Sequence, residues 1–403
     1  MVGIIYAILL LVVLTNFGLD HTTNLRKLNK PLGNGYSVLA ATVKKEEPEN
    51  VVYGFLPYWT IHKSEHFQLD KLTDIAYFAL NVNADGSIRK LDEEGNIDPG
   101  YNVWKNSEEL EQLISDAKEQ NVRFALTLIS HEDDVTREFL NCRSCWDKLA
   151  NAVTYELESK KITDVNMDFE LVEPDAEEGL SLKYSQLVNF LNNRLDRKFG
   201  SSFIVTSTLP DSMYRPRLTD IETLSNASDA LFVMAYDFHR PTSDNAGPVA
   251  PINGAGTHAE YDISTMLEDY LEVTAANKLV LGVPYYGYNW LVSSPSDYAE
   301  RIKGTDVLGY SISQTYSAIT ETKLKYQPEI NWDELGQVPY FSYFNPEYGT
   351  YRQVYYENED SLRFKYKLAK DNNLAGVGIW ALGYDGGYQE LWQLLEDEFY
   401  NPN

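Results

Sequence analysis

The sequence predicts an α/β protein built as a (β/α)8 TIM barrel, with a small α+β insertion between strand 7 and strand 8. Short apolar runs alternate with amphipathic helical patterns, and eight such runs occur over roughly 350 residues. A doubly wound open sheet is the structural alternative, but the Gly-rich phosphate turn expected for it is missing after the first run. The eight runs cover residues 51–56, 74–80, 122–129, 165–169, 203–208, 230–235, 279–283 and 376–381. The helical patterns between them include residues 107–120, 182–198, 265–277 and 360–372.

The N-terminal residues differ in character from this pattern. Residues 2–14 form an uncharged apolar run that is short for a membrane span and suits the core of a signal peptide. We therefore expect residues 1–18 to be a signal peptide or an N-terminal membrane anchor. The protein would then be secreted or anchored to the outer face of the cell membrane. Residues 19–50 are polar and typical of a linker, and we expect the folded barrel over residues 51–403.

The longest gap between runs separates strand 7 from strand 8. It has room for a helix and for an insertion at about residues 291–356, which is rich in Tyr and Trp. Residues 338–343 and 351–356 are expected to pair as two strands around the turn at 345–349. An insertion at the C-terminal face of a barrel would raise one wall of a cleft.

Composition limits the partners of this chain. Asp and Glu number 60 against 34 Lys and Arg, which gives a formal net charge of −26. We expect no nucleic-acid partner, and strongly anionic polymers are disfavoured as well, because like charges repel. A neutral polymer would be indifferent to this charge. The 29 tyrosines and 7 tryptophans can stack on the apolar faces of sugar rings, although many of them must fill the core.

The two cysteines, Cys142 and Cys145, form a CxxC pattern. No second CxxC or nearby His pair completes a zinc site, so we expect a small local disulfide at a helix start or two unpaired thiols. His131-Glu132 resembles the start of a metalloprotease motif, but no His follows at the required spacing.

The predicted fourth strand carries the most informative pattern. Side chains alternate with period two, so its polar residues share one face: Asp164, Asn166, Asp168 and Glu170. An ordinary amphipathic strand facing solvent would also explain the alternation. In a closed barrel, however, inward carboxylates at the C-terminal tip of a strand are unfavourable unless they have a function. Two carboxyl groups two residues apart can couple, so that one stays protonated beside an ionised neighbour.

The sixth strand ends with Met234, Tyr236 and Asp237. A phenol and a carboxylate at this tip could hydrogen-bond a polar group of a substrate. The alternative is that Tyr236 fills the core and that Asp237 is the N-cap of a helix.

The eighth strand places Gly376, Gly378 and Trp380 on one face. The two glycines leave room beside one large indole, which suits a platform on the barrel floor for a stacked ring. Trp380 as core filler is the alternative. Other aromatic residues that we expect at the mouth, after strands one and seven, are Phe55, Tyr58 and Tyr285.

Taken together, residues 164–171, 234–237 and 378–385 resemble the family 18 glycoside hydrolases, the chitinase-like enzymes, in the branch with an α+β insertion. The resemblance covers most of residues 51–392, in the family's strand order. It implies a (β/α)8 barrel that cleaves β-1,4 bonds beside N-acetylglucosamine, in chitin or chitooligosaccharide-like glycans.

The chain departs from the family pattern at two places. On the fourth strand, where the family has D-x-x-D-x-D-x-E, the second Asp falls on Asn166, and the first falls on Thr163. On the third strand, the expected Ser-x-Gly-Gly is replaced by residues 127–131, which end in His131. Neither departure removes the expected acid.

The resemblance implies a role for each matched residue. Glu170 would be the general acid, and Asp168 would orient the acetamide N–H of the substrate. Tyr236 would hold the acetamide carbonyl, Asp237 would support the distorted sugar and Trp380 would form the floor. The acetamide itself would act as nucleophile, through an oxazolinium intermediate, with no metal or organic cofactor. The expected substrate-binding residues are Asn166, Trp380, Met234, Phe55, Tyr58 and Tyr285.

Two other functions remain open from the sequence. One is an N-acetylglucosaminidase directed at peptidoglycan, which also carries acetamide groups. The other is a non-catalytic chitin-binding lectin of the same fold. Glu170 is present, and lectins of this type usually lack the acid, which favours the enzyme.

Overall fold

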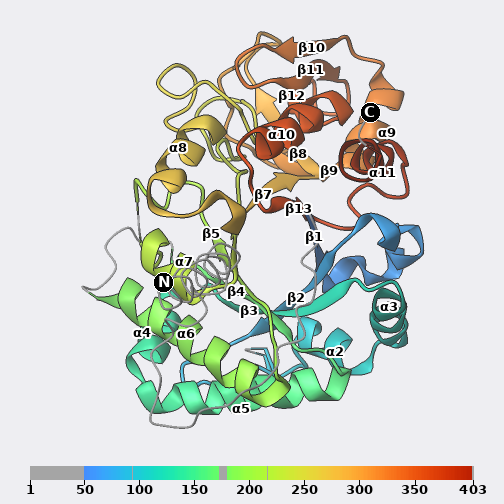
Figure 1. Ribbon diagram of the computed structural model, residues 1–403. Coiled ribbons are helices and arrows are strands. Elements are labelled where there is room, and N and C mark those ends of the chain that lie inside the picture. The colour runs from blue at the N-terminus through green and yellow to red at the C-terminus, as the bar shows by residue number, and fades with distance from the viewer. Residues whose placement is uncertain (1–49, 93, 172–178, 216, 402–403) are drawn as a thin grey trace, which may run out of the picture. The chain divides into compact units, whose positions relative to one another are not determined.

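The computed structural model describes residues 50–92, 94–171, 179–215 and 217–401. The eight predicted runs form a closed barrel of parallel strands in the order β1-β13-β7-β6-β5-β4-β3-β2 (Figure 1). The predicted fold class is therefore confirmed. The strands are β1 (Val51–Pro57), β2 (Asp74–Asn81), β3 (Arg123–Ser130), β4 (Asp164–Phe169), β5 (Ile204–Thr208), β6 (Ala230–Val233), β7 (Leu279–Pro284) and β13 (Gly376–Trp380).

Helices lie between successive barrel strands and cover the outside of the ring (Figure 1). They are α2 (Pro99–Asn106), α3 (Glu108–Glu119), α4 (Asp133–Asn141), α5 (Arg143–Lys160), α6 (Leu180–Phe199), α7 (Ile221–Ala227), α8 (Ile263–Val273), α10 (Glu359–Asp371) and α11 (Glu390–Leu395). The 3₁₀ helices are η2 (Tyr58–His66), η3 (Leu69–Lys71) and η4 (Ala276–Lys278), and η5 (Glu396–Tyr400) is a π-helix. Helix α3 begins as the sequence suggests, because the Ser107 side chain accepts a hydrogen bond from the backbone N–H of Leu110.

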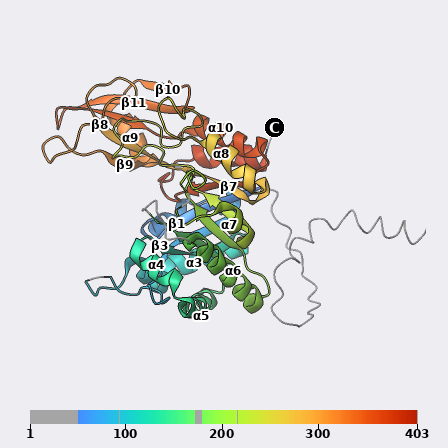
Figure 2. The ribbon, with the colours of Figure 1, turned by 90° about the vertical axis from the view of Figure 1, so that its left-hand side faces the viewer.

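A second sheet follows β7 and has the antiparallel order β10-β11-β12-β8-β9. Its members are β8 (Tyr286–Val292), β9 (Ile312–Thr315), β10 (Ile330–Asp333), β11 (Val338–Asn345) and β12 (Thr350–Tyr355), with helix α9 (Tyr316–Tyr326). Figure 2 shows these strands grouped on the side of the barrel away from α5. The predicted strand pair corresponds to β11 and β12. The run after β7 belongs to this sheet as β8, and not to the tip of the barrel strand.

Aromatic packing fills the barrel interior beneath its mouth. The Phe232 ring lies 4.8 Å from the Phe55 ring and 5.7 Å from the Tyr53 ring. A Cβ added at Gly378 would lie 2.1 Å from this Phe232 ring, and one added at Gly282 would lie 2.6 Å from it. The room expected beside Trp380 is thus occupied at Gly378 by the Phe232 ring of β6, which is two strands from β13 in the barrel. At Gly376 an added Cβ would instead meet the backbone of Val51.

Two peripheral predictions can be placed. Cys142 and Cys145 form a disulfide at the start of α5, as one of the two sequence alternatives has it. In the described part of the chain, no helix is long and apolar enough to cross a membrane. The predicted leader at 1–18 lies outside the described residues, and so does all of the predicted linker except Asn50.

We expect Gly378→Ala to lower the free energy of unfolding by about 1–3 kcal/mol, since the added methyl group overlaps the Phe232 ring. Denaturant unfolding monitored by circular dichroism measures this change. In a Phe232→Leu background the same substitution should cost less, because the ring that it meets is gone. Equal losses in both backgrounds would contradict the packing described here.

Candidate active site

Strand β4 presents its polar side chains to the barrel interior, as its period-two pattern predicts. Val165, Met167 and Phe169 are at most 1% exposed, and the Phe169 ring stacks on Tyr184 of α6 at 5.5 Å. Asp168 is therefore directed into the barrel, 3% exposed. Glu170 follows the strand, and its backbone N–H donates to the carbonyl of Ser130 on β3 at 3.1 Å.

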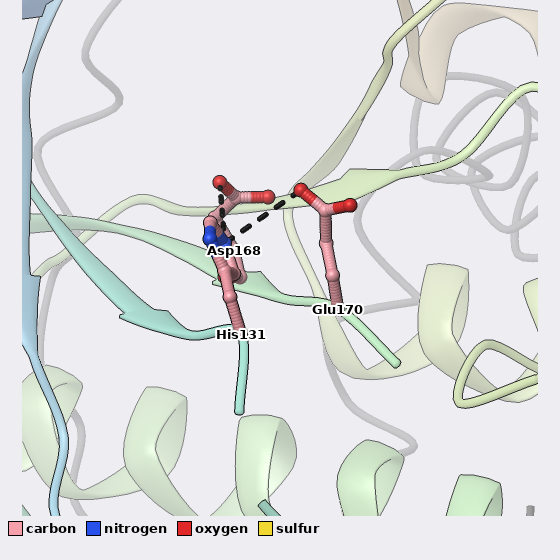
Figure 3. Close-up of side chains that lie close together, drawn as sticks. All are labelled: His131, Asp168 and Glu170. Carbon is pink, nitrogen blue, oxygen red and sulfur yellow. Dashed lines mark hydrogen bonds and ion pairs between the residues drawn. The ribbon is translucent and has the colours of Figure 1, made fainter. Parts of the chain in front are cut away.

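His131, the residue after β3, lies beside both carboxylates (Figure 3). Its Nε2 donates to the Asp168 carbonyl oxygen at 3.1 Å. The same nitrogen is 3.5 Å from Asp168 Oδ2 and 3.6 Å from Glu170 Oε1. In the sequence, His131 stands out only as part of an incomplete metalloprotease motif and as a departure from the family pattern. The signal available in the sequence was its position directly after the third strand, because the carboxyl ends of neighbouring parallel strands lie side by side.

These three groups shift one another's protonation. Burial is the main cause that raises the pKa of Glu170 to about 7, and the negative charge of Asp168 is the second. The charge of His131 offsets part of this rise. For His131, partial burial alone would lower the pKa. The hydrogen bond and the charge of Asp168, with the charge of Glu170, instead raise it to about 9. At neutral pH the site therefore holds a cationic imidazole and a glutamic acid poised to give up its proton.

Tyr236 and Asp168 each contribute a buried polar atom with no hydrogen-bond partner among the described residues. The atoms are the Tyr236 hydroxyl oxygen and Asp168 Oδ1. Burial and the nearby charge of Asp168 raise the pKa of Tyr236 well above its usual range, so the phenol remains a hydrogen-bond donor. Most buried polar atoms are satisfied within a protein, and two such atoms in one site suggest a polar ligand.

Asp237 is held by the insertion. Its Oδ1 accepts hydrogen bonds from the hydroxyls of Tyr286 and Tyr288, the latter at 2.6 Å, and its Oδ2 is 3.9 Å from Arg240 Nε. The backbone of Asp237 has a φ of 65°, which is left-handed, so this residue does not begin a helix as the alternative proposed. The two tyrosines, which β8 places opposite the barrel rim, were not predicted as partners of this carboxylate.

Trp380 lies at the mouth, half-buried. Its ring packs against Phe78 at 4.8 Å and against Phe55 at 5.4 Å. Phe55 is only 2% exposed and supports the indole from inside the barrel, so its predicted contact with substrate stays a prediction. Tyr58 is half-buried, and its ring packs edge-on against Trp59 at 4.9 Å.

Two more predicted substrate-binding residues lie away from the mouth. Asn166 is fully buried and donates to the Ser207 hydroxyl at 3.2 Å, because two residues along a strand place it about 6–7 Å deeper than Asp168. Tyr285 is 1% exposed, and its hydroxyl bonds that of Tyr366 on α10. Both side chains are buried against protein groups in this structure, and their predicted contact with substrate stays a prediction. Met234 is half-buried and lines a small cavity of about 10 Å³ beside Glu170.

His131, Asp168 and Glu170 are also the one group of three or more His, Cys, Asp and Glu within the described ranges whose ligand atoms lie close enough to hold a metal ion, within 4.8 Å of one another. The atom that would have to bind an ion, His131 Nε2, faces the Asp168 carbonyl oxygen at 3.1 Å and donates its proton to it. This geometry favours an acid–base cluster over a metal centre.

A parallel eight-stranded barrel with coupled carboxylates at the carboxyl ends of its strands is typical of glycoside hydrolases. Residues 51–385 match the family described as Glycosyl hydrolases family 18. The chain therefore belongs to glycosyl hydrolase family 18, and the resemblance read from the sequence is confirmed.

Individual relatives are distant. The chain is 23% identical over 332 residues to the cortical fragment-lytic enzyme of Bacillus anthracis, covering 81% of this chain and 68% of that protein. The crystal structure of the spore cortex-lytic enzyme SleL from Bacillus megaterium QM B1551 superposes with a TM-score of 0.68 at 20% identity, over 92% of this chain and 78% of that one. The crystal structure of a Cycas revoluta chitinase variant in complex with (GlcNAc)4 superposes with a TM-score of 0.70 at 18% identity, over 86% of this chain and 99% of that one. At these identities the solved structures establish the fold. The chain spans 56% to 77% of the length of three curated relatives.

We expect Asp168→Asn to lower the pKa of Glu170 from about 7 by about one unit or more, since a neighbouring negative charge is removed. Titration of the Glu170 carboxyl carbon by NMR in the full chain measures this shift. Asp237→Asn should lower the same pKa less, because Asp237 is the smallest of the named contributions. A Glu170 pKa that stays constant or rises in Asp168→Asn would refute the coupling.

Proposed function

We propose that this chain is a retaining glycoside hydrolase that cleaves β-1,4 bonds next to N-acetylglucosamine, in chitin or chitooligosaccharide-like glycans, by substrate-assisted catalysis. One observation carries the proposal: the buried, unpartnered Asp168 Oδ1 and Tyr236 hydroxyl. An acceptor and a donor on neighbouring residues match the N–H and the C=O of an acetamide. A sugar without this group would leave both buried atoms unsatisfied, which is unfavourable.

The proposed reaction has two steps. Glu170 gives its proton to the glycosidic oxygen while the acetamide carbonyl oxygen attacks the anomeric carbon, so the glycosidic bond breaks and an oxazolinium ion forms. Asp168 accepts a hydrogen bond from the acetamide N–H and stabilises the positive charge. Glu170, now ionised, then takes a proton from a water molecule whose oxygen attacks the anomeric carbon on the face that the leaving group occupied. The bond between this carbon and the acetamide oxygen breaks, so the oxazolinium ring opens and the configuration is retained.

The remaining groups bind the sugar. Tyr236 would donate to the acetamide carbonyl, and Asp237 Oδ2, which faces Arg240 at 3.9 Å, would accept from a hydroxyl of the distorted ring. The half-buried face of Trp380 would stack under that ring. Phe55, Phe78 and the paired tyrosines of β8 hold these groups in place and need not contact the glycan.

Peptidoglycan is the second candidate substrate, because it too carries N-acetyl groups. Two similar proteins are named a cortical fragment-lytic enzyme and a spore cortex-lytic enzyme, which supports testing peptidoglycan as a substrate. The formal net charge of −26 argues for a neutral polymer instead, since an anionic wall would be repelled.

We also propose that the protein acts outside the cell, either secreted or anchored by residues 1–18. The Cys142–Cys145 disulfide supports an oxidising compartment. A lectin role is disfavoured, because Glu170 is retained with its pKa raised to about 7.

Glu170→Gln should reduce turnover of a chitooligosaccharide by on the order of 10²–10⁴-fold, because the amide has no proton to give. A reducing-sugar assay measures the loss, and thermal unfolding checks that the fold is intact. Glu132→Gln is the matched control, since Glu132 lies at the same rim but pairs with Arg89 and should retain activity. Unchanged turnover in Glu170→Gln would remove Glu170 from the mechanism.

Cleavage should require the N-acetyl group. Product release from chitotriose, its fully deacetylated form, cellotriose and purified peptidoglycan can be compared by mass spectrometry. We expect products from chitotriose and none from the two sugars that lack acetamide. Efficient hydrolysis of cellotriose would rule out substrate assistance, and release from peptidoglycan alone would favour the second candidate.

A further inference from the structure

The feature that the proposed function leaves unused is His131. Its Nε2 faces three oxygens of β4 and of the residue that follows it, at 3.1 to 3.6 Å. A carbonyl oxygen can only accept, so the contact with the Asp168 carbonyl fixes the proton on Nε2. This one N–H is then shared with the two carboxylates of the site (Figure 3).

The local structure holds the imidazole at this point. β3 pairs with β4 so that Ile129 lies beside Asp168 and Ser130 beside Phe169. The Ser130 carbonyl accepts from the N–H of Glu170 and from the hydroxyl of Thr136 in α4. The residue before His131 is thus tied both to the acid and to the next helix.

We propose that His131 is a positioning residue that keeps a positive charge between Asp168 and Glu170 and so sets the pH at which the acid loses its proton. This inference rests on the proposed function of the same site. When Glu170 protonates the leaving oxygen, two neighbouring carboxylates are left ionised. A cation at 3.5 and 3.6 Å from their oxygens stabilises that state and leaves the acid free to act.

Other charges around the cluster do not replace this cation. After β6, Asp237 and Arg240 act on Glu170 with opposite signs, and Arg240 is 60% exposed on its side chain. Tyr236 is neutral because its pKa is raised. After β3, Glu132 is paired with Arg89, and Asp133 of α4 is 3.7 Å from Arg137. From β2 only the uncharged ring of Phe78 faces His131, at 6.4 Å.

The first test does not depend on activity. The imidazole of His131 is titrated by NMR in the intact chain, with its signal assigned from its absence in His131→Asn. We expect protonation to persist to a pH of about 9, and to be lost at lower pH in Asp168→Asn. Titration of the wild-type imidazole near the usual value of about 6.5 would overturn the inference, whether or not the protein hydrolyses any glycan.

The second test uses the pH dependence of kcat/KM on a chitooligosaccharide. The acid works only while protonated, and a nearby cation lowers its pKa. Removing the cation in His131→Asn should therefore move the limb where activity falls with rising pH to higher pH by about one unit. We expect kcat to fall about tenfold at its optimum, with KM little changed.

Two variants separate this role from a structural one. His131→Lys restores a charge and should return the limb toward its wild-type position, whereas His131→Gln should not. His62→Asn removes an exposed imidazole with no ion pair to a carboxylate within the described residues, and should leave the profile unchanged. If this limb of the kcat/KM profile does not move in His131→Asn, the inference is refuted. The activity of Glu170→Gln then tests the proposed function separately. If His131→Asn does not fold, His131→Gln and the wild-type titration decide the question.

Discussion

The structure depends on how a closed barrel accommodates two acids on adjacent inward positions of one strand. Asp168 and Glu170 cannot both be ionised at low energy without a neighbouring cation. Burial and the charge of Asp168 raise the pKa of Glu170 to about 7, and His131 limits that rise. The carboxyl group of Glu170 can thereby hold a proton near neutral pH, which is the condition for acid catalysis.

The aromatic interior makes this electrostatic arrangement possible. Phe232 fills the space that Gly282 and Gly378 leave open and packs against Phe55, so side chains fill this part of the barrel interior. Phe55 and Phe78 then support Trp380 at the mouth. Charges interact more strongly where water is excluded. The same packing that stabilises the barrel therefore strengthens the coupling between its acids.

The insertion is part of the site and more than a wall beside it. Because β8 begins two residues after β7 ends, Tyr286 and Tyr288 reach back to Asp237. Two phenols on Oδ1 of Asp237 fix the orientation of this carboxylate, so that its Oδ2 faces Arg240 at 3.9 Å. A change in the insertion sheet would thus reach the site through hydrogen bonds.

Local pattern was enough to predict the eight runs, the pair β11 and β12, and the inward face of β4, because period and spacing determine them. It was not enough for contacts between distant segments. Nothing near Gly378 in the sequence says that Phe232 fills its space, and Tyr285 looks like a mouth residue until α10 is placed against it. His131 was visible as a departure from a pattern, but its meaning required the register of β3 against β4.

The two departures from the family pattern act in the same direction. Where the family has a second Asp beneath Asp168, this chain has Asn166, a neutral amide bonded to Ser207. At the tip of β3 it has His131, which is cationic at neutral pH. One change removes a negative charge from below the pair, and the other adds a positive charge beside it. Both lower the electrostatic cost of ionising Asp168 and Glu170 together. Because Asn166 cannot share a proton with Asp168, the imidazolium of His131 is the group placed to balance the charge of the two carboxylates.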